Sequence, residues 1–387
     1  TVTYEGLSAP WSTVVNGTNA GAAANGVQSL GLGNPIYDEA VFLGEERIDR
    51  AFSLLSGEIN ASAKSVLVSD SRFVRNAVFD RLLMASGGTQ ASGMATADLR
   101  YASNGEAAAP TSAASMGTVW AEGFGSWGST DGNSNVSSLD RNSSGVFIGA
   151  DTLVSAWRLG VFGGYSHTHF DVDNLSSSGD SDSYHAGVYA GSSWQNVLFR
   201  AGAAYSWNDL STTRLASLPT SQTLSADYNA GTGQIFGEVG YDVDAGPVGF
   251  QPFAGLAYVN LHTGSFTETG GVAALTSPSE STSVSYTTLG VRASADFALG
   301  SLLARADGMV GWRHAFGDVT PEATYTFAAG GNPFTVDGVP IGEDSFLLDL
   351  GLSAFVYQGV SVGVAYSGEF ASDASDQSVS GNVSWTF

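Results

Sequence analysis

Two histidines close together on one predicted strand are the first residues of this chain whose spacing suggests chemistry. Ser166-His167-Thr168-His169 places both imidazoles on the same face, near the outer end of the strand. A zinc site needs further ligands, and a Ser-His-Asp triad needs a carboxylate that orients the histidine. The sequence places neither beside this pair. We therefore interpret the two histidines as a polar rim at the mouth of a loop region.

The rest of the chain carries little that points to catalysis. It lacks both the Gly-x-Ser-x-Gly elbow and the His-Glu-x-x-His motif. The acidic runs that begin at Asp171 and Gly179 have calcium-binding residue types, but solvated loops are the more common use of such runs. A barrel protease remains an alternative, with His169, His185 or His262 facing a loop aspartate. We predict a protein that is not an enzyme and has no cofactor or metal.

Composition favours one large all-β body. The chain has 387 residues, with Gly 50, Cys 0, 13% charged residues and a net charge of -23, a charge that excludes nucleic acid as a partner. No stretch reaches the roughly 20 apolar residues of a transmembrane helix, so membrane insertion would require a closed barrel. There is no secretion signal at Thr1, and we expect the chain to be the C-terminal part of a longer protein.

Twelve runs between residues 118 and 387 have the length and composition of strands that cross a bilayer. Short connections alternate with long polar ones, as in bacterial outer-membrane barrels. The predicted strands are 118–128, 144–154, 157–170, 181–194, 197–210, 227–243, 248–263, 282–298, 302–316, 343–357, 360–370 and 377–387. The predicted short turns are Ser155-Ala156, Gln195-Asn196, Ala245-Gly246, Gly300-Ser301 and Gln358-Gly359.

The two faces of these strands differ in polarity. Near the C-terminus Val383, Trp385 and Phe387 share one face, whereas Asn382 and Ser384 share the other. An Arg or Lys at the bilayer midplane costs about 2–4 kcal/mol on the lipid face, so charged strand residues belong in the lumen. The charged residues assigned to the lumen in this way are Glu122, Arg158, Arg200, Glu238, Arg305, Asp307, Arg313, Asp349 and Glu369.

Three segments precede the predicted barrel. Residues 1–35 have the composition of a linker or of the end of an upstream region, and residues 87–117 that of a flexible tether. Between them, residues 36–86 show helical spacing, with Ile48, Phe52 and Leu55 three or four positions apart. We expect interruptions at Gly57 and at residues 69–71, with Ser69 or Ser71 capping a second helix that includes residues 72–82.

The segment from Leu55 to Arg75 resembles the region before the barrel in classical (type V) autotransporters. Several stretches of the barrel also look like the β-domain of that family, and the resemblance covers roughly residues 36–387. These stretches are Trp120-Ala-Glu-Gly-Phe-Gly-Ser-Trp-Gly, Phe162-Gly-Gly-Tyr-Ser, Arg200-Ala-Gly-Ala-Ala-Tyr-Ser-Trp, Gly311-Trp-Arg-His-Ala-Phe-Gly-Asp and the terminal Phe387.

The resemblance implies a twelve-stranded antiparallel transmembrane barrel over residues 118–387, with an N-terminal helix in its lumen. It implies a translocator that anchors and exports its own N-terminal passenger to the cell surface, as a monomer in outer-membrane lipid. Phe387 would be the signal read by the barrel assembly machinery, after periplasmic chaperones have delivered the chain.

A lumen helix also has a physical reason, because a barrel of about twelve strands is too wide for its own side chains to fill. We expect the helix arginines to pair with charges on the wall. The expected helix residues are Arg72, Arg75 and Arg81. The expected wall residues are Glu122, Arg200, Glu238, Asp307 and Asp349.

Some autotransporters release the passenger when an asparagine in this helix cyclises on its own backbone carbonyl. The asparagines available here are Asn60 and Asn76, each followed by alanine. The paired asparagines of the best-known self-cleaving subgroup are missing, so polar helix positions are the favoured interpretation. A barrel enzyme and a plain porin are the alternatives to the translocator, and neither requires a helix and tether before its first strand.

Overall fold

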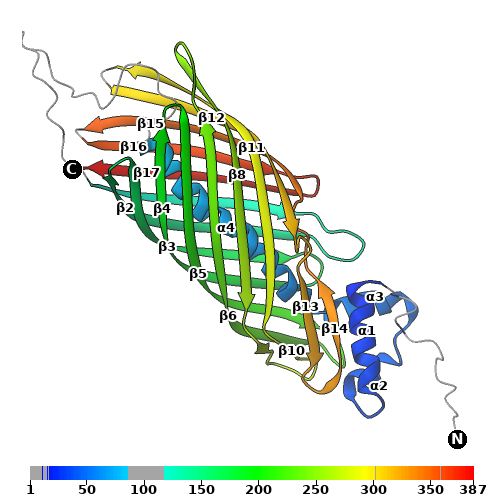
Figure 1. Ribbon diagram of the computed structural model, residues 1–387. Helices are drawn as coiled ribbons and strands as arrows, with labels where there is room; N and C mark the ends of the chain where they lie inside the picture. The colour runs from blue at the N-terminus through cyan, green and yellow to red at the C-terminus, as the bar shows by residue number, and fades with distance from the viewer. Residues whose placement is uncertain (1–10, 12–14, 16, 86–116, 301, 358) are drawn as a thin grey trace, which may run out of the picture.

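Twelve long antiparallel strands close into a barrel in the computed structural model, which describes residues 11, 15, 17–85, 117–300, 302–357 and 359–387 (Figure 1). Each strand pairs with the next, and β17 pairs with β1 to close the sheet. The barrel strands are β1 (Thr118–Thr130), β2 (Leu139–Val154), β3 (Trp157–Val172), β4 (Ser177–Trp194), β5 (Val197–Ala216), β6 (Gln222–Tyr241), β8 (Val248–Thr263), β11 (Glu280–Leu299), β12 (Leu302–Gly317), β15 (Asp344–Tyr357), β16 (Val360–Phe370) and β17 (Ala374–Thr386). The predicted fold class is confirmed, and every predicted strand has a counterpart.

The outward face of the barrel is apolar, as the alternation predicts. Leu256, Ile235 and Val364 point outward and are about 60% exposed or more. Exposed aromatic residues lie toward both ends of the strands, including Trp194 at one end and Phe316 at the other. An apolar band with aromatic girdles is the outer surface that a bilayer requires of a barrel.

Short turns join the strands at the end of the barrel where the C-terminus lies (Figure 1). Each contains a residue with a positive φ, the backbone geometry that tight hairpin turns require. These residues are Ser155, Gln195, Gly246, Gly300 and Gly359, with φ between 54° and 74°. The predicted turn positions Ser301 and Gln358 lie outside the described residues.

A second sheet extends from the opposite end of the barrel. It has four strands in the order β14-β13-β10-β9. Its members are β9 (Phe266–Thr267), β10 (Leu275–Ser277), β13 (Glu322–Phe327) and β14 (Gly330–Asp337), and the short β7 (Val243–Ala245) pairs separately with β8. The sequence predicts long polar connections over the segments that form this sheet, so the second sheet is a difference from the prediction.

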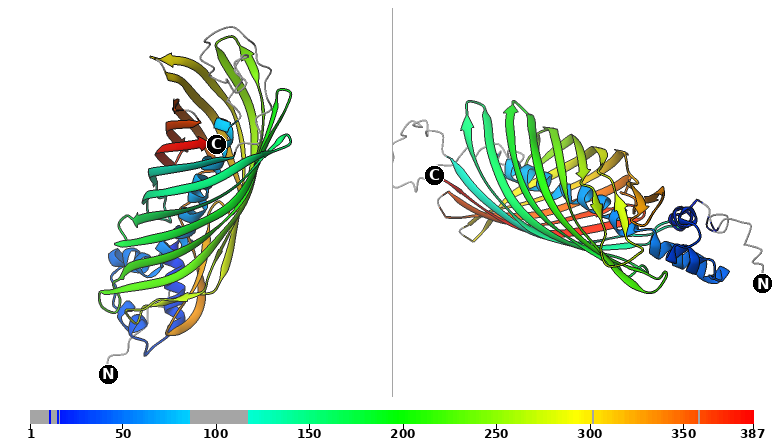
Figure 2. Two further views of the ribbon diagram at one scale, coloured as in Figure 1. Left: turned by 90° about the vertical axis from the view of Figure 1, so that its left-hand side faces the viewer. Right: turned by 90° about the horizontal axis from the view of Figure 1, so that it is seen from below.

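The described residues before the barrel form four helices: α1 (Asn19–Leu30), α2 (Pro35–Ala40), α3 (Glu45–Leu55) and α4 (Glu58–Ala85). α4 runs through the barrel, and α1–α3 lie beyond the end opposite the C-terminus, which we call the outer end (Figures 1 and 2). None of the helices among the described residues combines the length and apolarity of a membrane span. The tether expected at 87–117 lies outside the described residues except for Gly117.

The helical region differs from the prediction in two respects. Gly57 does separate α3 from α4, with φ +74°. However, α4 continues without interruption through Ser69 and Ser71, so the predicted second cap is wrong. Ser71 Oγ donates to the Val68 carbonyl at 2.6 Å, as a serine inside a helix does. The barrel strands enclose α4 at this position, and their contacts stabilise it as one continuous helix. In addition, α1 occupies residues for which we expected a linker.

The apolar core of the outer end joins α1–α3 to three loops of the barrel. We call α1–α3 with β9, β10, β13 and β14 the outer cap. Its core has members from every part of this unit, and many are fully buried. The largest fully buried side chains of this core are Ile36, Phe52, Leu55, Leu224, Leu275, Tyr325 and Phe327.

Candidate functional site

The lumen of the barrel is the candidate site, because α4 occupies it along most of its length (Figure 2). Twenty of the 28 residues of α4 are buried, on all sides of the helix. A helix that is buried all round must find polar partners for its charged residues within the wall. The wall supplies such partners at several positions along α4.

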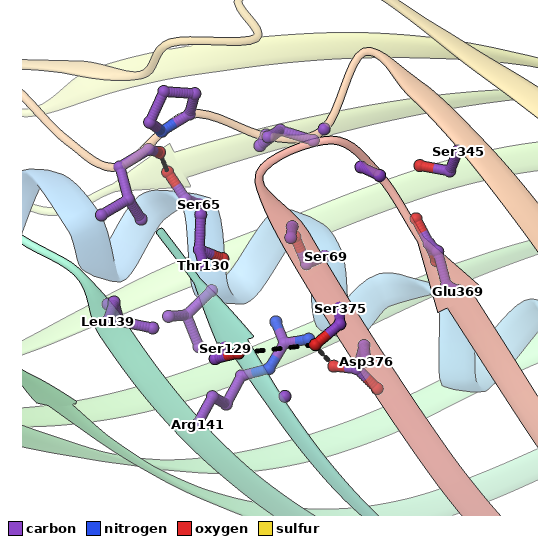
Figure 3. Close-up of a pocket in the computed structure, with 18 of the residues that line it drawn as sticks. Ser65, Ser69, Ser129, Thr130, Leu139, Arg141, Ser345, Glu369, Ser375 and Asp376 are labelled. Carbon is purple, nitrogen blue, oxygen red and sulfur yellow. Dashed lines mark hydrogen bonds and ion pairs between the residues drawn. The ribbon is translucent and has the colours of Figure 1, made fainter. Parts of the chain in front are cut away.

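At the middle level, Arg72 donates to Asp376 of β17, to Glu369 of β16 and to Ser126 Oγ of β1. Arg141 of β2 binds the second oxygen of Asp376 (Figure 3). The same Arg141 forms an ion pair with Asp70 of α4 at 3.2 Å. Two arginines and three carboxylates thus tie α4 to the strands on either side of the barrel closure.

Toward the C-terminus of α4, Arg81 forms a bidentate pair with Asp151 of β2. Its Nε and Nη2 lie 2.6 and 2.9 Å from the two carboxylate oxygens. Arg158 and the hydroxyl of Tyr189 also donate to Asp151, at 2.6 and 2.8 Å. Trp120 in turn donates to the oxygen of Tyr189 at 2.7 Å. Asp151 is therefore the most heavily bonded carboxylate of the lumen wall in the described chain.

Arg75 has neutral partners. Its Nη1 donates to Gln234 Oε1 and Ser71 Oγ, both at 2.9 Å, and its guanidinium lies 5.2 Å from the Tyr286 ring centroid. Toward the outer end, Lys64 donates to Glu280 at 2.5 Å and to the Glu322 carbonyl at 2.6 Å.

The predicted wall residues form two other groups. Glu238 lies between Arg200 and Arg292, 2.6 and 2.7 Å from them, and so joins wall residues to each other. Glu122, Asp307 and Asp349 are near enough to Asp80 of α4 to interact electrostatically with it. The bonds that Arg72, Arg75 and Arg81 make within the described chain lead instead to Asp376, Glu369, Gln234 and Asp151.

Asp151 and Asp376 are not among the predicted partners of the helix arginines, although the strand alternation contains a signal for Asp376. Asp376 lies an even number of residues before Asn382 and Ser384, so the alternation places all three on the same polar face of the strand. The alternation indicates the face of a residue, but not the height at which it meets a helix residue.

The two asparagines of α4 have different surroundings. Asn60 is buried, accepts from Thr212 Oγ1 at 2.7 Å and places Nδ2 3.5 Å from Glu268 Oε1. Asn76 is half-buried. At the end of the chain, Phe387 donates its backbone N–H to the Gly117 carbonyl at 3.0 Å, and its ring is 55% exposed.

The histidine pair of β3 lies on the outward face. His167 contacts Asp182 at 3.0 Å and His169 contacts Asp180 at 2.8 Å, both across the β3–β4 ladder. His185 faces inward, with Ser166 at 2.9 Å from one ring nitrogen and Ser206 at 2.7 Å from the other. A catalytic triad has a carboxylate at that second nitrogen. Among the described residues, no three acidic or histidine side chains are arranged to hold a metal.

At the outer end, Glu58 begins α4 in a polar cluster beyond the membrane strands. It accepts from the Ser137 backbone at 2.7 Å and from Asn19 Nδ2 at 3.1 Å. Burial, with a smaller contribution from the nearby Asp337 carboxylate, raises the pKa of Glu58 to about 7, against the lowering effect of the two hydrogen bonds.

Comparison with known proteins agrees with this architecture. Residues 119–367 match the family model described as autotransporter beta-domain. Two curated proteins of Serratia marcescens, both named extracellular serine protease, are 32% identical over 94% and 96% of this chain. The chain spans about a third of the length of each.

Two solved structures share the fold. The translocator domain of the autotransporter NalP from Neisseria meningitidis has a TM-score of 0.60 at 14% identity, covering 83% of this chain and 99% of that one. The beta domain of the Bordetella autotransporter BrkA has a TM-score of 0.54 at 16% identity, covering 70% of this chain and all of that one.

Proposed function

The chain belongs to the autotransporter family, and from that premise we propose how its barrel acts as an outer-membrane translocator that anchors an N-terminal passenger and exports it to the cell surface. The observation that carries the proposal is the path of the chain. Residues 19–55 lie beyond the outer end, α4 passes through the lumen, and the strands follow. A chain with this path is anchored by the barrel while its N-terminal part projects outside.

The lumen helix is proposed to act as a plug that remains after export. Arg72, Arg75 and Arg81 are the helix residues of this proposal, and their bonds to the wall support it. Wall pairs such as Arg200 with Glu238 would keep the lumen polar before the helix arrives. A polar wall suits export because it offers few apolar surfaces on which an unfolded passenger would be retained. A plain porin would have no use for such a helix.

Insertion into the outer membrane implies partners that this chain does not contain. We propose that the barrel assembly machinery reads the C-terminal strand with Phe387, and that periplasmic chaperones deliver the chain as a monomer. The exposed ring of Phe387 at the end of β17 supports this role.

The names of the curated relatives lead us to propose a serine protease as the passenger. The barrel itself has no assigned catalytic role in this proposal, and the Ser166-His185-Ser206 contact provides no carboxylate. Self-cleavage at Asn60 or Asn76 is a separate proposal. If it occurs, substitution of the cleaved residue by Asn60→Asp or Asn76→Asp leaves the full-length chain uncut on a gel. A pattern that is unchanged for both variants contradicts self-cleavage.

Display of a reporter tests the main proposal. A signal peptide and an epitope tag placed before Thr1 should give a tag that antibodies detect on intact cells and that external protease removes. A tag that stays inaccessible until the outer membrane is opened contradicts export. Deletion of residues 58–85 should then raise single-channel conductance in planar bilayers, and unchanged conductance contradicts the plug.

A further inference from the structure

We propose that the other elements of the outer cap form a noncovalent dock for α1, so that a chain cut in the turn between α1 and α2 keeps its N-terminal piece bound to the translocator. The inference rests on the proposed function, since the N-terminal piece is the part that follows the passenger. It adds a second anchor, which does not depend on the covalent continuity of the chain.

The apolar face of α1 is buried in the core of the outer cap. Ala23, Ala24 and Val27 are completely buried, and α1 packs against β14 and α3. The packing against β14 is close: a Cβ added at Gly26 would lie 2.6 Å from the Phe334 ring and 3.1 Å from the Phe327 ring. Contact at this density is typical of a protein interior or of a specific interface.

Polar bonds fix both ends of α1. The Asn19 side chain donates to the Asp337 carbonyl and accepts from the Asp337 N–H, both at 2.8 Å. The Asn19 backbone N–H donates to Asn135 Oδ1 at 2.5 Å. At the other end, Ser29 Oγ accepts from the Asn332 N–H at 2.7 Å. These partners belong to β14 and to the loop between β1 and β2, so they hold the helix in one position and register.

Residues before α1 contribute an aromatic contact. Trp11 is 8% exposed, and its ring centroid lies 5.4 Å from that of Tyr37 and 5.5 Å from that of Phe52. A buried tryptophan at the centre of an interface often contributes a large share of the binding energy. Trp11 and α1 together therefore form a continuous contact surface on the N-terminal side of the turn.

The turn itself is the exposed point of this region. Gly31 and Gly33 have φ of +72° and +94°, and Leu32 between them is 87% exposed. Exposed turns are preferred sites of proteolysis. A cut there removes one covalent bond but none of the contacts described above. A free helix of 12 residues is only marginally stable in water, so undocking would also unfold α1.

The dock can be tested on the purified full chain in detergent. A recognition sequence for a site-specific protease is inserted between Leu32 and Gly33, and an epitope tag is added at the N-terminus. After complete cutting, we expect the tagged piece to co-elute with the barrel in size-exclusion chromatography. Elution of the piece on its own would overturn the proposal.

A matched pair of substitutions identifies the surface responsible. Ala24→Asp buries a carboxylate against the cap, and we expect it to release at least half of the cut piece. Asn25→Asp adds the same charge on the exposed face of α1 and should leave the piece bound. Retention in both variants contradicts docking through this face. Uncut Ala24→Asp protein should still elute as a folded barrel.

The same chain on intact cells separates the two proposals. External protease should cut the inserted site, and the tag should remain with washed cells. An inserted site that external protease leaves uncut, seen as a tagged chain of unchanged length on a gel, contradicts the proposed export, while the co-elution result in detergent still decides the dock.

Discussion

The consecutive helices α3 and α4 place their charged side chains in opposite surroundings. α3 buries Ile48 and Phe52 and leaves Arg47 and Arg50 exposed. α4, which begins three residues after α3 ends, buries its arginines and bonds them to wall residues such as Asp376 and Asp151. The difference follows from the surroundings: α3 is covered on one side, whereas α4 is enclosed by the barrel.

The two regions also differ in the side chains that hold them together. The outer cap brings its apolar residues together beyond the outer end of the barrel. The lumen has aromatic contacts to α4 as well, and it adds buried charged and polar side chains that bond to the helix. Burial of apolar side chains therefore stabilises the N-terminal segment beyond the barrel, and ion pairs and hydrogen bonds contribute strongly to the stability of α4 within the lumen.

The largest effect is expected in the outer cap. Phe52→Ala should destabilise the cap by about 4 kcal/mol, because it opens a cavity at a fully buried position. Hydrogen exchange of cap amides measures this loss. The control Leu32→Ala shortens a side chain that is 87% exposed and should change exchange little. Equal effects of the two substitutions would mean that the cap is not held by its apolar core.

The corresponding test in the lumen is Asp151→Asn. It leaves Arg81 and Arg158 without their shared carboxylate, at a cost of about 3 kcal/mol. We expect a lower thermal midpoint in detergent and more frequent open events in planar bilayers. Asp140→Asn on the exposed face of the same strand should change neither. A midpoint that stays constant for Asp151→Asn argues against charge pairing as the basis of the plug.

The junction of the two regions should respond to pH through Glu58. Its pKa is raised to about 7 in the folded chain, so the folded state holds this proton more tightly than the unfolded state. The stability from this group is therefore greatest below pH 4.5 and declines as pH rises to 7, on the order of 2 kcal/mol. Glu58→Gln should flatten the pH profile of cap exchange, and Glu46→Gln at an exposed position should not. A profile that rises from pH 4.5 to 7 would falsify the assignment.

The smallest effect is expected outside both regions. Asp182→Asn breaks the exposed contact with His167, and exposed ion pairs contribute about 0.2–1 kcal/mol. The thermal midpoint should shift far less than for Asp151→Asn. A comparable shift would show that burial is not what distinguishes the lumen pairs.

Local patterns in the sequence were sufficient to predict the barrel. A strand in a bilayer must alternate apolar and polar residues along its own length, so residues such as Val383 and Asn382 indicate their faces without knowledge of any neighbour. The short turns and the break at Gly57 are equally local, because each depends on the backbone conformation of one or two residues. The resemblance to the autotransporter family rested on such stretches.

The tertiary structure decided the contacts of α4 and the existence of the outer cap. Which carboxylate meets Arg72 or Arg81 depends on the height and rotation of the helix against twelve strands, and no local pattern records these quantities. α1 and the hairpin of β13 and β14 are weak signals in isolation, since a short alanine-rich helix and a polar loop gain their order only by burying Ala24, Val27 and Phe334 against one another. The sequence by itself thus determined the barrel, and packing between distant segments decided how the chain inside and above it is held.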